Sequence, residues 1–388
     1  MFHVVLAALA VLLLAPGVMT ALHLAVMATA SLRFRAERPE GEIPPVRFLV
    51  VVPAHNEELL LGATLQAIVD SKRDRDQILV VDDRSDDRTG EIAASFGATV
   101  LRRNPGDEPG RAAARQAAIE YSKTIEWDAM AMIDADSVVA VDYFARCEAA
   151  LANGAQALQA RSEAERGNRL VDQAAIASFA VQGVTLPRGR EALHLPVRLR
   201  GTGMVLRRDL LERLRFTATA SEDLQVSLDL VQEGVRTRHV DDARLRSANA
   251  DSWRVASTQK QRYEAGRMGA ARAFVPKLLR CRNAAGFEAA WFLVSPPFAL
   301  AVGLLLLGFV PAAFSGVWPV IWVAPVALAL LTWCFAIASV QARVGPRIVL
   351  ALLFAPFYIA WKLIIQTKAL LQMRGGVPEF GATARGKA

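Results

Sequence analysis

The chain has 388 residues, of which 53% are hydrophobic and 21% are charged. This apolar content excludes an intrinsically disordered chain, and 25 glycines with 18 prolines are too few for a collagen-like one. Three widely spaced cysteines indicate neither a disulfide framework nor a cysteine-based zinc site. The formal net charge is +7, which is compatible with a nucleic-acid partner, so the positions of the basic residues have to be considered.

The N-terminal segment is uncharged from Met1 to Leu32, and Arg33, Arg35 and Arg38 follow it closely. A helix needs roughly 20 apolar residues to cross the hydrocarbon core of a bilayer. A cleavable signal peptide is the alternative, but its charges come before a shorter apolar run. We therefore predict a retained transmembrane helix over residues 1–32, followed by a juxtamembrane linker over residues 33–46.

A second uncharged segment covers residues 289–342, and Pro311, Gly316 and Pro319 interrupt its middle. This pattern predicts two transmembrane helices joined by a tight turn. Residues 343–388 contain a third apolar segment and a basic tail. The lysines of that segment are compatible with either a span or an interfacial helix, so both alternatives stay open.

Basic residues gather on one side of the predicted spans, between Arg33 and Arg47 and again between Arg262 and Arg282. The positive-inside rule then places residues 33–288 in the cytoplasm. This predicts a multi-pass protein of the cell inner (cytoplasmic) membrane with a cytosolic domain. Because these basic residues would face membrane lipids, we expect lipids and no nucleic acid as a partner.

The region 47–288 alternates short β-branched runs with segments of helical periodicity. Strands are predicted at residues 47–53, 77–82, 98–101 and 129–134, and helices at residues 58–71, 86–96 and 111–123. Asp86 or Asp87 is suited to cap the second helix. This alternation predicts an α/β fold with a doubly wound, Rossmann-like sheet that binds ligands beyond the carboxyl ends of its strands.

Acidic side chains follow two of the predicted strands. Asp82 and Asp83 close the second strand, and Asp134 and Asp136 close the fourth. Aspartates commonly cap turns and helices, but two pairs that open into one crevice favour a ligand site. The Asp-x-Asp spacing suits Mg²⁺ or Mn²⁺ bridging phosphates. The sequence has no Walker-type loop, so the metal and basic side chains would have to hold the phosphates.

Several short motifs succeed one another along this region. They are Pro53-Ala-His-Asn-Glu57, Asp82-Asp83, Asp134-Ala-Asp136, Gly201-Thr-Gly203, Ser221-Glu-Asp-Leu224 and Gln259-Lys-Gln-Arg-Tyr263. In this order, between apolar termini, they resemble the family 2 glycosyltransferases, inverting membrane-attached enzymes that include cellulose and hyaluronan synthases. The resemblance implies a GT-A fold over residues 47–288, a nucleoside-diphosphate sugar donor with UDP favoured, and Mn²⁺ or Mg²⁺ as cofactor.

The resemblance also implies roles for individual residues on the donor side. Pro53, Ala54, His55 and Glu57 would lie against the nucleotide base, and Asp83 would recognise that base. Asp136 would be the direct metal ligand. Asp134 would lie next to the metal and would also contact the nucleotide sugar. Arg262 would contact the pyrophosphate, although contact with membrane lipid is an alternative for this residue.

On the acceptor side, the resemblance implies a small-residue loop formed by Gly201, Thr202 and Gly203. Glu222, Gln259 and Tyr263 would lie near the acceptor, and Asp223 would act as the general base. Capping of a helix by Glu222 and Asp223 is an alternative that is compatible with catalysis. The side chains of Asp83, Asp136, Asp223 and Arg262 are therefore expected to converge on one cavity that faces the cytosol.

Two departures from the family pattern bear on the reaction. Tyr263 stands where the family usually has Trp, and Ala112 to Arg115 replace an Ala-Leu-Asn stretch. We therefore expect a hexosyltransferase that adds a single sugar to a lipid-linked or glycan acceptor in exopolysaccharide or cell-surface glycan synthesis. A processive polysaccharide synthase, a nucleotidyltransferase and a catalytically inactive membrane scaffold are the alternatives.

Overall fold

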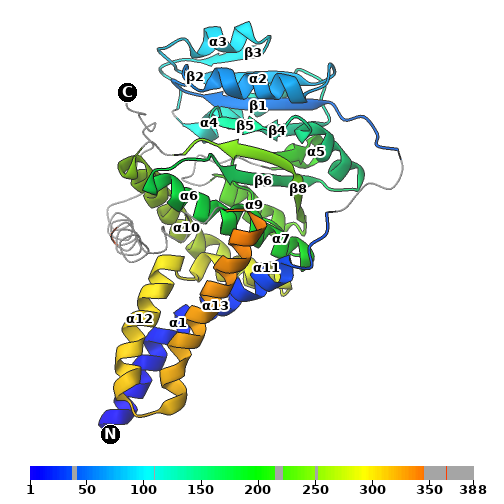
Figure 1. The fold of residues 1–388 in the computed structure, drawn as a ribbon. Coiled ribbons are helices and arrows are strands. Elements are labelled where there is room, and N and C mark those ends of the chain that lie inside the picture. The colour runs from blue at the N-terminus through cyan, green and yellow to red at the C-terminus, as the bar shows by residue number, and fades with distance from the viewer. Residues whose placement is uncertain (37–41, 109, 215–221, 250–251, 345–363, 365–388) are drawn as a thin grey trace.

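The computed structural model describes residues 1–36, 42–108, 110–214, 222–249, 252–344 and 364. An α/β domain built around one sheet occupies one end of the molecule, and apolar helices project away from it to the N-terminus (Figure 1). Apart from residue 364, the predicted third C-terminal segment lies outside the described residues.

One sheet of eight strands forms the centre of the α/β domain. The strands are β1 (Phe48–Ala54), β2 (Gln77–Asp83), β3 (Thr99–Arg103), β4 (Ala129–Met132), β5 (Ser137–Val139), β6 (Ala157–Ala164), β7 (Met204–Arg207) and β8 (Thr237–Ser247). Their order is β3-β2-β1-β4-β7-β6-β8-β5. The first four are parallel, β7 is antiparallel to both of its neighbours, β8 is parallel to β6, and β5 is antiparallel to β8.

The predicted α/β class is confirmed, but the regular parallel pattern stops at β4. β5 begins at Ser137, only five residues after β4 ends at Met132, yet it pairs at the far edge of the sheet. Five residues span less than about 20 Å, so the sheet must curl to bring that edge back towards β4. The predicted fourth strand was too long, because Asp134 lies in this connection and not in β4.

The β-branched run of β1 explains the two-sided core. Phe48, Val50 and Val52 pack on one face with α2 (Leu61–Ser71) and α5 (Tyr143–Ala152). Leu49 and Val51 pack on the other face with α4 (Arg111–Ser122) and α9 (Glu222–Gln232). Successive residues of a strand point to opposite faces, so a continuous apolar run fits a strand that is buried on both sides.

Two predicted helices begin later than expected. α2 starts at Leu61 because the turn before it is closed by the amides of Leu60 and Leu61, which both donate to the Glu57 carbonyl oxygen. α3 (Thr89–Ser95) has Arg88 at its N-cap position, so the prediction of Asp86 or Asp87 there was wrong. The Asp87 carboxylate instead accepts a hydrogen bond from the Thr89 amide, at 2.9 Å.

Three long apolar helices pack together away from the sheet. They are α1 (Phe2–Ser31), α12 (Phe298–Phe314) and α13 (Trp318–Gln341). By length and composition, α1 and α13 are each able to cross a membrane. The expected turn lies between α12 and α13, where Gly316 adopts a φ of 68°, whereas Pro311 lies inside α12.

The first helix of the predicted hairpin differs from a simple span. α11 (Ala284–Val294) and α12 meet at 70°, and Pro296 and Pro297 lie in the break between them. Prolines lack an amide donor and end the helical hydrogen-bond ladder. α11 packs on α9 and on α10 (Trp253–Arg280) through an apolar cluster. The predicted start of the transmembrane hairpin at residue 289 therefore falls inside a helix that contacts the α/β domain.

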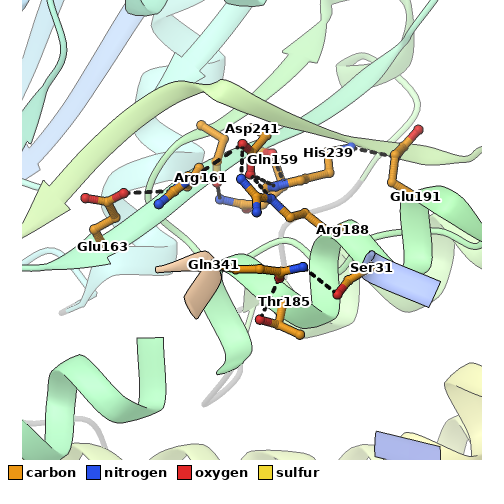
Figure 2. Close-up of polar contacts among 11 residues, drawn as sticks. Ser31, Gln159, Arg161, Glu163, Thr185, Arg188, Glu191, His239, Asp241 and Gln341 are labelled. Carbon is orange, nitrogen blue, oxygen red and sulfur yellow. Dashed lines mark hydrogen bonds and ion pairs between the residues drawn. The ribbon is translucent and has the colours of Figure 1, made fainter. Parts of the chain in front are cut away.

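A helical connector joins the sheet to the apolar helices. It consists of α6 (Leu170–Phe179), a π-helical turn (Ala180–Thr185) and α7 (Leu186–Ala192). A Cβ added at Gly189 would lie 2.1 Å from the Met27 carbonyl oxygen of α1, so only glycine allows this approach. Figure 2 shows Gln341 of α13 between Ser31, to which it donates, and Thr185, from which it accepts.

Candidate functional site

Asp83 lies at the carboxyl end of β2 in a polar cluster. Its carboxylate accepts hydrogen bonds from Arg103 Nη1 at 2.7 Å and from the Gly110 amide at 3.2 Å. His55 Nδ1 lies 2.6 Å from the Asp83 carbonyl oxygen. The first two motifs are therefore in direct contact. Pro53 and Ala54 are the last residues of β1 and lead into this contact.

Asp82 and Asp83 have different surroundings. The Asp82 carboxylate accepts a hydrogen bond from the Ser85 amide at 3.2 Å and is almost completely buried. The Glu57 amide donates to Thr89 Oγ1 at 2.9 Å, which holds the first motif against the loop after β2. Asp82 therefore organises this loop, whereas Asp83 contacts the segment that begins α4.

Two arginines of α4 reach the acidic residues that follow β4 and begin α9. Arg111 Nη1 lies 3.1 Å from an Asp134 carboxylate oxygen. Arg115 is fully buried, with Nη1 2.6 Å from Glu222 Oε1 and Nη2 3.4 Å from Asp134 Oδ1. Arg115 Nη2 also donates to the Gly201 carbonyl oxygen at 2.8 Å. One guanidinium thus connects the Asp-x-Asp loop, the glycine loop and the N-terminus of α9.

Several of the predicted acidic residues act on the charge of Arg111. Its pKa is raised by the negative charges of Asp134, which acts most strongly, and of Glu222, Asp136 and Asp223. A charge affects a pKa strongly only at short range. The carboxylates of Asp134, Asp136, Glu222 and Asp223 are therefore near enough to Arg111 to act on its charge. The convergence of Asp136 and Asp223 on one cavity stays a prediction.

Asp223 has a raised pKa. Burial is the main cause and the negative charge of Glu222 adds to it, raising the pKa of Asp223 to about 6. Arg115, Arg111 and the hydrogen bond from the Leu224 amide oppose this rise. A carboxylate with such a pKa is ionised at neutral pH and is still able to accept a proton readily.

The glycine loop lies against the Asp-x-Asp loop. The Asp134 amide donates to Thr202 Oγ1 at 3.1 Å, and the Gly203 amide donates to the Met132 carbonyl oxygen at 2.8 Å. Gly201 and Gly203 have φ values of 80° and 71°, which favour glycine. A Cβ at Gly203 would also meet a Leu245 methyl group at 2.2 Å.

The aromatic residue of the last motif approaches the same site from α10. Burial raises the pKa of Tyr263, and the charges of Arg198 and Asp223 act on it. Gln259, one turn earlier in α10, is exposed. Arg262 belongs to the same helix, but its side chain is outside the part of the chain that the structure describes. The predicted convergence of Arg262 on the site therefore stays a prediction.

Sequence reasoning missed Arg111, Arg115 and Gln159. Arg111 and Arg115 share one face of α4 because they are four residues apart, and this spacing in an alanine-rich helix was the available signal. Gln159 of β6 is buried, accepts from the Arg200 amide at 2.9 Å and donates to the Thr202 carbonyl oxygen at 3.0 Å. Nothing in the local sequence distinguishes it from other strand residues.

Gln159 also belongs to a buried polar network (Figure 2). His239 Nδ1 lies 3.2 Å from the backbone carbonyl oxygen of Gln159, and His239 Nε2 lies 3.3 Å from Asp241 Oδ1. Arg188 of α7 donates to the same Asp241 carboxylate at 2.6 and 2.7 Å. The network links the glycine loop to the helical connector described above.

The residues after β4 suit a divalent cation. Asp134 and Asp136 are partly exposed and offer carboxylate oxygens, the ligands that Mn²⁺ and Mg²⁺ prefer. Among the described residues, no group of three or more His, Cys, Asp and Glu side chains is arranged to hold a metal alone. Two carboxylates completed by substrate phosphates are a common arrangement for these ions.

A cavity of about 180 Å³ lies where β8 ends and α6 begins. Ala248 lines the cavity, and its amide donates to the Asp136 carbonyl oxygen at 3.0 Å. The wall also includes Asn249, Arg169 and Asp172, where α6 begins. The cavity is thus connected to the Asp-x-Asp loop through the backbone of Asp136.

Comparison with known proteins identifies the domain. The family model described as "Glycosyltransferase like family 2" matches residues 44–266. A probable glycosyltransferase of Bacillus subtilis, YdaM, is 35% identical over 104 residues, which are 25% of this chain and 24% of that protein. The uncharacterized protein MJ1222 of Methanocaldococcus jannaschii is 46% identical over 62 residues, 16% of this chain and 25% of that protein. The chain thus matches only about a quarter of the length of these relatives.

A solved structure shares the fold over most of both chains. It is the mannosyltransferase PcManGT from Pyrobaculum calidifontis, in complex with GDP-Man and Mn²⁺. The TM-score is 0.58 at 18% sequence identity, and the match covers 87% of this chain and 99% of that chain. The likeness confirms the GT-A type of sheet together with the helices that flank it.

We predict that Arg115→Met destabilises the protein strongly, because it leaves the carboxylates of Asp134 and Glu222 without their buried partner. Removing one member of a buried ion pair costs about 3–5 kcal/mol, which lowers the Tm by about 6 °C or more. Thermal unfolding in detergent measures this. The matched control is Arg146→Met, which removes an exposed pair with Asp142 and should cost less than about 1 kcal/mol. Equal shifts for the two variants would contradict the bridging role.

Proposed function

The chain belongs to the glycosyltransferase-like family 2, and on that premise we propose that it is an inverting transferase. It moves a sugar from a nucleoside-diphosphate sugar to an acceptor hydroxyl. The observation that carries this proposal is the position of Asp223. This carboxylate, with a pKa of about 6, follows Glu222, and Arg115 pairs with both Glu222 and Asp134, which with Asp136 is suited to a metal–diphosphate complex.

The proposed reaction is a single displacement at the anomeric carbon. The acceptor oxygen forms a bond to this carbon while the bond to the diphosphate oxygen breaks, and the nucleoside diphosphate leaves with the electron pair. Asp223 accepts the hydroxyl proton as the new bond forms. General-base catalysis of this kind contributes roughly 10²- to 10⁴-fold to the rate.

The leaving diphosphate needs positive charge, and the proposed donor site supplies it. Asp136 and Asp134 would hold Mn²⁺ or Mg²⁺, which neutralises charge on phosphate oxygens when bound. Arg111 adds a guanidinium next to Asp134. Pro53, Ala54, His55, Glu57 and Asp83 are proposed to form the base pocket, supported by the contact of His55 with Asp83. Arg262 is proposed to contact the pyrophosphate.

The acceptor is proposed to approach from the side of α9 and α10. Glu222, Tyr263 and the loop of Gly201, Thr202 and Gly203 lie there around Asp223. Gln259 is exposed on α10 and is proposed to contact the outer part of the acceptor.

We further propose that the enzyme works at the cytoplasmic face of the inner membrane on a lipid-linked or glycan acceptor. The apolar helices α1 and α13 support membrane attachment, as does the basic character of the flanking segments. Within the described residues, the two candidate spans, or up to three with the bent pair, offer little material for a polysaccharide pore. This favours transfer of a single sugar over processive synthesis, for exopolysaccharide or other surface glycans.

We predict that Asp223→Asn lowers nucleotide release by about 10²- to 10⁴-fold, because the amide does not accept the proton. The assay measures nucleotide released from a panel of UDP- and GDP-sugars with Mn²⁺ and lipid acceptors. Donor affinity should stay within about twofold, since Asp223 does not contact the diphosphate in this scheme. Asp229→Asn, a change two turns further along α9, serves as the control and should keep activity.

Two outcomes would contradict this assignment. A loss of donor affinity as large as the loss of rate would place Asp223 in donor binding instead. No release by the unaltered protein from any donor, with any lipid acceptor of the panel, would favour the catalytically inactive scaffold.

We also predict that kcat/KM falls about tenfold per pH unit below pH 6, because protonated Asp223 is no longer a base. Glu222→Gln removes a negative charge that raises this pKa, so the acid limb should move to lower pH. The pH–rate profiles of both proteins measure the shift. The pKa of Asp223 is higher in the folded protein than in the unfolded chain, so protonation of Asp223 stabilises the fold. The loss of activity at low pH is therefore not caused by unfolding that protonation of Asp223 induces. An acid limb at the same pH in both proteins would contradict the prediction.

A further inference from the structure

Arg200 occupies a fixed position directly before the glycine loop. Its amide donates to Gln159 Oε1 at 2.9 Å, and its carbonyl oxygen accepts from the Thr202 amide at 2.9 Å. Figure 2 shows how Gln159 is itself held within the buried network. The guanidinium carbon of Arg200 lies 5.0 Å from the centre of the Phe179 ring, at the end of α6. Both the backbone and the side chain of Arg200 are thus positioned.

The charge of Arg200 is balanced differently from that of its neighbours. The other arginines around the site pair with carboxylates: Arg111 and Arg115 with Asp134, Arg188 with Asp241, Arg190 and Arg198 with Glu288, and Arg267 with Glu264. In the described part of the chain, no carboxylate lies within 4 Å of the Arg200 guanidinium. Burial lowers its pKa, and the charges of Tyr263 and Asp223 oppose this shift.

A half-buried guanidinium without a carboxylate partner is costly to desolvate. Its planar set of donors matches the oxygens of a phosphate group. Phe179 already covers one side of Arg200, and Tyr263 is near enough to act on its charge. An anion bound between these groups would satisfy the donors of Arg200.

The position relative to Asp223 separates this site from the proposed donor site. Asp223 acts on both Arg111 and Arg200, whereas Asp134 and Asp136 act on Arg111. Gly201 directly follows Arg200, and a Cβ added there would lie 3.5 Å from Asp223 Oδ2 and 3.3 Å from Arg115 Nη2, so the glycine loop lies close to both groups. Beyond Arg200, Arg198 contacts Glu288 and stacks on Phe292 of α11, the helix that leads into the apolar α12. Arg200 thus belongs to the segment that leads from α11 contacts into the glycine loop, which is proposed for the acceptor.

We propose that Arg200 binds a phosphate group of the acceptor and so presents a neighbouring hydroxyl group to Asp223. This inference rests on the proposed function and specifies its substrate class: a phosphate ester that carries a hydroxyl close to the phosphate. A lipid headgroup and a soluble phosphate ester share this chemistry.

The test measures binding of glycerol 3-phosphate, with glycerol as the neutral comparison, to the full chain by calorimetry. The protein is held in nanodiscs of phosphatidylcholine, with Mn²⁺ and a nucleoside diphosphate present. We expect glycerol 3-phosphate, and not glycerol, to bind the unaltered protein. Arg200→Gln should weaken this binding at least about tenfold, because charge-assisted hydrogen bonds are lost. Arg200→Lys should restore part of it, and the control Arg146→Gln should bind as the unaltered protein does.

A second set of discs contains phosphatidylglycerol, whose headgroup carries hydroxyls next to its phosphate. Weaker apparent binding of glycerol 3-phosphate in these discs identifies the lipid headgroup as the occupant, and unchanged binding identifies a soluble ester. Either result supports the phosphate site. Equal binding of glycerol and glycerol 3-phosphate, no binding of either, or equal affinity in Arg200→Gln would overturn the proposal.

Donor binding on the same samples separates this inference from the proposed function. Arg200→Gln should bind the nucleotide donor as the unaltered protein does, because Arg200 belongs to the segment proposed for the acceptor. If the unaltered protein binds no donor, the proposed function fails. If it binds donor and the phosphate results are negative, only the role of Arg200 fails.

Discussion

The site depends on one buried cation. Arg115, at 0% exposure, joins Asp134 after β4, the Gly201 carbonyl oxygen and Glu222 at the start of α9. These segments are far apart in the sequence, and each carries residues proposed for a different task. A guanidinium without water contact needs such partners, since an uncompensated buried charge costs several kcal/mol. The pairing therefore fixes the segments relative to one another.

The balance of charges around this bridge sets the properties of Asp223. Burial and Glu222 raise its pKa, whereas Arg115 and Arg111 limit the rise. The result is a base that is ionised at neutral pH but close to its proton-accepting range. Arg200, whose charge Asp223 also affects, lacks a carboxylate partner among the described residues. Metal-bound donor, base and anionic acceptor would then each meet a group of opposite charge.

The sequence predicted those parts of the fold that follow from local patterns. The apolar run of β1, the aspartates that end β2 and those that follow β4 were visible, because strand burial and strand ends leave local signals in the sequence. The mixed half of the sheet was not, since β7 has four residues and its antiparallel pairing depends on distant strands. Arg115 also gave little signal, because tertiary packing alone buries it. Likewise, the sequence shows the two prolines before α12 but not the bend that they cause. The bend directs α11 onto α9 and α10, and this packing depends on distant residues.

The central claim is that the crevice beyond β2 and β4 binds a nucleotide sugar through a divalent cation on Asp136 and Asp134. Calorimetric titration of the full chain with UDP- and GDP-sugars, in Mn²⁺ and in EDTA, tests it most directly. We predict binding of at least one donor in Mn²⁺, loss of that binding in EDTA, and loss in Asp136→Asn even with Mn²⁺. Donor binding that is equally strong in EDTA, or unchanged in Asp136→Asn, would contradict it.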